Sequence, residues 1–304
     1  MLFRTMMICA AIAAGMLFAP AIAASQKDHE DCSKAGGDIA IPSCTRIIND
    51  HNESVRNRAI AYYNRGSAWS DKGDNDRAIA DYSETIRLDP NYAPAYNNRG
   101  NAWGDKGDTD RAIADYSEAI RLDPKFVPAY NNRGSAWGDK GDNDRAIADY
   151  SEAIRLDPKG AGSYRSRGHA NFDKGDFTAA AADLLRASDL TDDAHAMLWR
   201  FLALGRMGQD GIAELSANAA RLKAKDWPYA VIDFYLGRQS FDEMSAAAAS
   251  DGDRCEVQFY FGEWNVLRGD KEEAKLALQK AVEICPKGFI EHAGAVAELK
   301  RLNR

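Results

Sequence analysis

Hydrophobic, aromatic and small residues recur at a fixed distance through the middle of this sequence. Tyr62, Gly66 and Trp69 are spaced i, i+4 and i+7, which places them on one face of a helix. A period of about 20–50 residues indicates stacked supersecondary units instead of one globular core. The same residue types return every 34 positions, at Tyr96, Tyr130 and Tyr164, at Gly100, Gly134 and Gly168, and at Trp103 and Trp137.

Each unit predicts two antiparallel helices. Gly73 is a C-terminal stop for the first helix, and Asp74 is an N-cap for the second. Pro90 ends the second helix, because proline lacks an amide donor and keeps the residue before it out of the helical region. Gly66 lies within the first helix, where glycine costs about 1 kcal/mol relative to alanine. Its recurrence predicts that the two backbones approach closely there, with Gly66 against Ala78.

The residue pattern that recurs within each unit is similar to the signature of the tetratricopeptide repeat, and the period is the same. The similarity rests on Tyr62, Gly66, Trp69, Ala78, Tyr82, Thr85 and Pro90. Four such repeats are expected over residues 59–194, and the fourth has Asn171 in place of the tryptophan and Asp192 in place of the proline. The resemblance implies an all-α fold: a right-handed superhelical solenoid of helix hairpins whose first helices line a concave face.

Residues 195–304 keep helical periodicity but lose most of the repeat pattern. One clear repeat returns at 255–288, and Phe289–Leu302 is expected to close the array, with Glu298, Lys300 and Arg301 on an exposed outer face. Further helices are expected at Leu198–Met207, Gly211–Leu222, Trp227–Leu236 and Phe241–Ala249.

The C-terminal third also resembles the end of an envelope lipoprotein that carries tetratricopeptide repeats. The resemblance rests on Trp227, Val231–Gly237, Phe259–Gly262 and Phe289–His292. It implies a homodimeric adaptor whose partners are an envelope protease or a murein hydrolase. The present sequence lacks the lipid-attachment cysteine of that family.

The first 24 residues have the composition of a secretory signal peptide. Arg4 is the only charged residue, Met6–Ala19 is apolar, and Ala21–Ala23 has the small residues of a cleavage site. The apolar run is about 14 residues long, whereas a membrane-spanning helix needs about 20. The protein is therefore expected to be exported to the periplasm and soluble there after cleavage.

Four cysteines follow the signal segment, and an oxidising compartment favours their pairing. Three connectivities exist for Cys32, Cys44, Cys255 and Cys285. The repeat register favours the two local pairs. Cys32 and Cys44 fall on facing helices of a degenerate half-repeat at 25–58, and Cys255 and Cys285 fall at meeting ends of one hairpin. The alternative is that the thiols are buried and free.

Charge and motif content exclude several functions. Lys and Arg total 39 against 46 Asp and Glu, for a net charge of −7, whereas nucleic-acid binding favours a basic face. The sequence has no metal-binding, nucleophile-elbow or phosphate-loop motif, so no catalytic residue, metal or cofactor is expected. The segment Asp28–Cys32 is expected to be a solvated acidic start and not a metal site.

The polar residues of the first helices are the candidate peptide-binding residues. Asparagine offers both donors and acceptors, which suits the backbone of an extended peptide, although a consensus polar surface would have the same composition. Arg65 and its counterparts Arg99, Arg133 and Arg167 are expected to pair with Asp81 and its counterparts; the alternative is a track for phosphate or acidic peptides. The candidate groove residues are Asn64, Asn97, Asn98, Asn101, Asp105, Asn131, Asn132, Ser135, Asp139, Arg165 and His169.

Together these features predict a non-catalytic periplasmic scaffold or adaptor that binds protein or peptide segments in its concave groove. A link to envelope proteolysis or peptidoglycan turnover follows from the second resemblance. The alternative is a structural repeat protein that assembles with copies of itself.

Overall fold

The computed structural model describes residues 23–34 and 36–303, and all regular structure in these ranges is helical. The predicted all-α repeat solenoid is confirmed, whereas most of the expected signal peptide, residues 1–22, lies outside the described residues. Among the described helices, none is long and apolar enough to cross a membrane. The helices are α1 (Gln26–Lys34), α2 (Gly37–Asn49), α3 (Val55–Asp71), α4 (Asn75–Leu88), α5 (Ala93–Asp105), α6 (Thr109–Leu122), α7 (Val127–Asp139), α8 (Asn143–Leu156), α9 (Ala161–Lys174), α10 (Phe177–Thr191), α11 (Ala194–Arg206), α12 (Ile212–Ala219), α13 (Tyr229–Tyr235), α14 (Phe241–Ala247), α15 (Asp251–Arg268), α16 (Lys271–Ile284) and α17 (Ile290–Leu302).

The regular hairpins pair α3 with α4, α5 with α6, α7 with α8 and α9 with α10. Gly73, at the first hairpin turn, has a φ of 74°, a backbone conformation that favours glycine. Asp74 then caps α4, because its carboxylate accepts the backbone N–H of Arg77 at 3.1 Å. The same turn recurs at Gly107, Gly141 and Gly175.

The mid-helix glycines allow a tyrosine ring to approach the helix backbone. A Cβ atom on Gly66 would lie 2.9 Å from the Tyr82 ring, and one on Gly134 would lie 2.9 Å from the Tyr150 ring. The expectation that Gly66 packs against Ala78 was therefore wrong. The close approach is between the first-helix backbone and the aromatic side chain of the second helix.

An arginine joins each hairpin to the one before it. Arg65 on α3 donates two hydrogen bonds of 2.8 Å to the Asp81 carboxylate on α4, and a third to the hydroxyl of Thr45 on α2. This confirms the expected ion pairs. The arginines are largely buried, so the pairs are less screened by water than pairs on an open surface. The equivalent pairs are Arg99–Asp115, Arg133–Asp149 and Arg167–Asp183.

Both local disulfides are present. Cys32 and Cys44 join α1 to α2 with their Cα atoms 4.8 Å apart, and Cys255 and Cys285 join the two ends of the α15–α16 hairpin at 4.9 Å. Asp28, expected in a solvated start, is instead buried, and its carboxylate pairs with Arg46.

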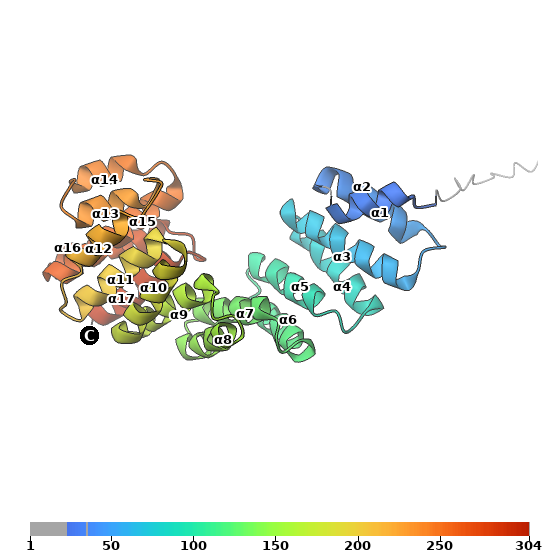
Figure 1. The fold of residues 1–304 in the computed structure, drawn as a ribbon, viewed down its shortest axis with the longest axis horizontal. Helices are drawn as coiled ribbons and strands as arrows, with labels where there is room; N and C mark the ends of the chain where they lie inside the picture. The colour runs from blue at the N-terminus through green and yellow to red at the C-terminus, as the bar shows by residue number, and fades with distance from the viewer. Residues whose placement is uncertain (1–22, 35, 304) are drawn as a thin grey trace, which may run out of the picture.

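The C-terminal half forms one body around a large aromatic core, while α1–α6 extend away from it (Figure 1). Trp199 is fully buried; its ring stacks on Phe259 at 5.0 Å and meets Phe172 edge-on at 5.0 Å. Helix α17 packs on α15 and α16 and also on α9, far away in sequence. Consequently Glu298, expected on an exposed face, is only 1% exposed; that expectation was wrong because α17 is covered on this side.

Two glycines of α7 test the ring-against-backbone contact. Gly134→Ala should destabilise the protein by about 1–2 kcal/mol, because the added methyl group displaces the buried, rigid Tyr150 ring. Gly138→Ala should stabilise it by up to about 1 kcal/mol, because no atom lies within 4 Å of the added Cβ and alanine favours helix. Urea unfolding followed by circular dichroism measures both. Equal shifts for the two variants would contradict this packing.

Candidate peptide-binding groove

The first helices of the regular hairpins, α3, α5, α7 and α9, contact one another in order and form an inner layer. Amide side chains connect them. The Asn98 side chain donates to the Tyr63 hydroxyl at 3.0 Å, and the Asn132 side chain donates to the carbonyl oxygens of Asn97 and Asn101, each at 3.0 Å. The asparagines that the sequence assigned to the groove therefore also hold successive units in register.

The predicted groove residues differ in exposure. Asn97 and His169 are buried, at 4% and 6% exposure, and cannot offer an open surface. Arg165 is partly exposed and pairs with Asp193 at 2.6 Å. The exposed members are Asp105, Ser135 and Asp139, and the partly exposed ones are Asn64, Asn98, Asn101, Asn131 and Asn132.

Each inner helix carries an aspartate near its C-terminal end, at the same register position. Three of them, Asp71, Asp105 and Asp139, are exposed, and we call them the acidic strip. Among the ion pairs that the structure describes, none involves these three residues. Burial raises the pKa of the Tyr116 hydroxyl, and the charges of Asp105 and Asp139 raise it further. Tyr116 thus lies close to two successive members of the strip.

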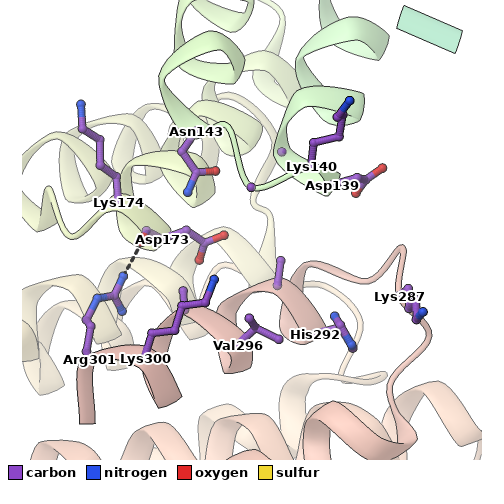
Figure 2. A pocket seen from close by; sticks show the side chains of 14 residues that line it. Asp139, Lys140, Asn143, Asp173, Lys174, Lys287, His292, Val296, Lys300 and Arg301 are labelled. Carbon is purple, nitrogen blue, oxygen red and sulfur yellow. Dashed lines mark hydrogen bonds between the residues drawn. The ribbon is translucent and has the colours of Figure 1, made fainter. Parts of the chain in front are cut away.

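At the fourth unit the equivalent aspartate, Asp173, is covered by α17. The Arg301 guanidinium donates to the backbone carbonyls of Phe172 and Asp173 at 2.6 and 2.7 Å. A cleft of about 400 Å³ remains between α7, α9 and α17. Figure 2 shows Asp139 and Asp173 on one side of this cleft and the cationic residues of α17 and its preceding loop on the other.

A network of buried charges fixes α17. The Arg206 guanidinium pairs with both Glu263 and Glu298, and Glu298 also pairs with Arg301 at 2.5 Å. The network thus contains two carboxylates and two guanidinium groups. Burial raises the pKa of Glu263 to about 7, although Arg206 acts in the opposite direction.

Two further acids at the α17 contact are shifted in the same direction. Burial raises the pKa of Glu291 to about 7, and the nearby Glu256 carboxylate adds to the shift. Burial also raises the pKa of Asp173 to about 7, and its Oδ1 atom has no hydrogen-bond partner among the described residues.

His169 lies beneath the cleft. Its ring packs 4.6 Å from the Trp199 ring, and its Nε2 atom is buried without a hydrogen-bond partner. Burial lowers the pKa of this imidazole to about 3, so it is neutral near pH 7. The sequence placed His169 on the groove but gave no sign that Trp199 and α17 would cover it.

Three profiles of the repeat family match this chain. One tetratricopeptide repeat profile covers residues 93–126, a second covers 66–107 and 139–175, and a third covers 268–287. These matches fall on the helix hairpins just described. The chain contains tetratricopeptide repeats over these residues.

Solved structures of low sequence identity share the fold of this repeat protein. A tetratricopeptide repeat protein from Parabacteroides merdae is 15% identical, with a TM-score of 0.56, over 91% of this chain and 96% of that one. The C-terminal part of a repeat protein from Cytophaga hutchinsonii is 17% identical, with a TM-score of 0.52, over 88% and 96%. PilF of Pseudomonas aeruginosa is 15% identical, with a TM-score of 0.51, over 80% and 99%.

The sequence did not identify the residues that close the fourth repeat. Glu291 and Glu298 are seven residues apart, a spacing that puts both on one helix face and is the only local signal that they act together. Arg206, the partner of Glu298, lies 92 residues before it in sequence, and no periodicity connects the two.

The three buried acids Asp173, Glu263 and Glu291 predict that the free energy of unfolding falls as the pH rises. Their pKa values are raised to about 7 in the folded protein, from ordinary values of 3.8 for Asp and 4.5 for Glu. Their contribution is therefore fully present below about pH 4 and is lost as the pH rises through 7. From about pH 6.5 to about pH 8.5, the free energy of unfolding should fall by about 1 kcal/mol for each acid that ionises.

Glu291→Gln provides the control, because the amide cannot ionise. This variant should lose less stability than the wild type over the same pH range in urea unfolding. A wild-type stability that is constant or rises over that range would contradict the assignment.

Proposed function

We propose that this protein is an exported, non-catalytic scaffold whose inner layer binds a segment of a partner protein. The observation that carries the proposal is the inner layer itself. Helices α3, α5 and α7 keep exposed polar side chains on one continuous surface, and this surface ends where α17 covers α9. Repeat solenoids use extended surfaces of this kind for binding.

Export is supported by the signal-like residues 1–24 and by the two disulfides, which suit an oxidising compartment. The contacts at the start of the described chain fit cleavage after Ala23. The backbone nitrogen of Ala24 lies 2.8 Å from the carboxylate of Asp50, which is itself buried. A chain beginning at Ala24 would place its positive α-amino group on this carboxylate.

An adaptor role in envelope proteolysis or peptidoglycan turnover is the finer proposal. It rests on the resemblance of the C-terminal third to the envelope lipoprotein family. The partner would then be an envelope protease or a murein hydrolase, bound by one chain or by a homodimer. The shifted acids at α17 are accounted for by the packing of that helix, so they give no support to a catalytic role.

Affinity capture with the exported protein as bait tests the proposal. Ser135→Arg should abolish recovery of the partner, because it places a large cation on the exposed inner layer. Ala114→Arg is the matched control, since it makes a similar change at an exposed site on the outer helix α6. The intact mass of the bait should correspond to a chain beginning at Ala24.

Recovery of the same proteins by wild type and Ser135→Arg would contradict binding at the inner layer. Recovery of no partner, together with a concentration-dependent oligomer in light scattering, would support self-assembly instead. A bait that keeps residues 1–23 would contradict the proposed export.

A further inference from the structure

Among the residues that the structure describes, no cation pairs with the acidic strip. A lysine follows each member directly, but Lys72, Lys106 and Lys140 are engaged elsewhere. Each of them pairs with an aspartate on an outer helix of the preceding unit, at Asp38, Asp76 and Asp110 respectively. Asp71 and Asp105 therefore keep charges that face solvent, and Asp139, on the next inner helix, is partly enclosed by a cleft, where burial raises its pKa.

A second observation indicates a ligand at the end of the strip. Asp139 lines a cleft that also contains Ser135 and His169. The Asp139 carboxylate pairs with no cation within the part of the chain that the structure describes, and partial burial raises its pKa. A cation bound in the cleft would stabilise the charged form of this carboxylate.

In the fourth unit, a cationic helix of the chain itself covers the position equivalent to the acidic strip. There the equivalent aspartate, Asp173, is covered by a helix that brings Lys300 and Arg301 to the cleft, and Arg301 donates to the backbone of Asp173 (Figure 2). The chain thus covers one acidic position with a cationic segment of its own and leaves three open.

We propose that the acidic strip binds a lysine- or arginine-bearing segment of the partner protein, with one cation over each aspartate. The inference rests on the proposed scaffold function and specifies the chemistry of the segment. Neighbouring helices pack with axes about 10 Å apart, and a polyproline II segment advances about 3.1 Å per residue with every third side chain on the same face. Successive aspartates therefore match cations at every third residue of a segment in this conformation.

The cations of α17 set the limit of this surface. Lys287 and Lys300 face the cleft beyond Asp139 and repel a cationic segment from the fourth unit. The bound cations are thereby confined to α3, α5 and α7. The net charge of the chain, −7, also favours encounter with a basic segment.

A synthetic peptide tests the proposal directly. The probe carries a fluorescein label and a lysine at every third position, separated by serine and glycine, and binding is followed by fluorescence anisotropy at low salt. The triple variant Asp71→Asn, Asp105→Asn and Asp139→Asn should bind it about tenfold more weakly than wild type. Added salt should weaken the wild-type complex.

The matched control removes three charges with the same 34-residue period from the outer helices: Glu84→Gln, Glu118→Gln and Glu152→Gln, each of which pairs with an arginine on its own helix. This variant should change the affinity by less than about twofold, because its carboxylates lie off the strip and their loss does not release Lys72, Lys106 or Lys140. Circular dichroism and urea unfolding should show that both triple variants are folded.

Three outcomes would overturn the proposal: equal weakening by the two triple variants, no binding of the lysine peptide to wild type, or equal binding of a peptide with glutamate in place of lysine. If the lysine peptide fails while affinity capture still recovers a partner that Ser135→Arg loses, the scaffold function stands and only the cationic chemistry is wrong.

Discussion

The contact between α17 and the last turn of α9 sets where the accessible part of the inner layer ends. Carbonyl groups at a helix C-terminus lack intrahelical donors and carry the negative end of the helix dipole, so a guanidinium is a favourable partner. Arg301 supplies it, donating to the carbonyls of Phe172 and Asp173 from a position more than 120 residues away in sequence. On its other side that arginine pairs with Glu298, which also pairs with Arg206.

This contact divides the molecule into an open and a closed part. In the open part, near-identical hairpins are joined by Gly–Tyr packing and by Arg–Asp pairs, and the inner layer remains accessible. In the closed part, aromatic side chains around Trp199 form a core, and the carboxylates of Glu263 and Glu298 are buried beside Arg206. Such burial stabilises one arrangement only while every charge is paired or neutral, which explains the raised pKa values of the acids at α17.

The sequence predicted what depends on local signals. The 34-residue period, the aspartate caps and the turn glycines all act within one unit, so the regular hairpins could be read from them, as could the pairing of Cys32 with Cys44. The burial of Glu298 could not be predicted, because it depends on contacts of α17 with α9 and α11. These helices lie far from α17 in sequence, and no periodicity connects them. For Gly66 the pattern indicated a close approach but not that the Tyr82 ring fills it.

Hydrogen exchange followed by mass spectrometry tests the closure of the fourth repeat most directly. Amides of 290–302 and of the last turn of α9 should be protected in the wild type. In Arg301→Ala both segments should exchange at least about tenfold faster, because hydrogen bonds to a charged group are lost, while α3–α8 keep their protection. Rapid exchange of 290–302 in the wild type, or an unchanged α9 in the variant, would contradict the account.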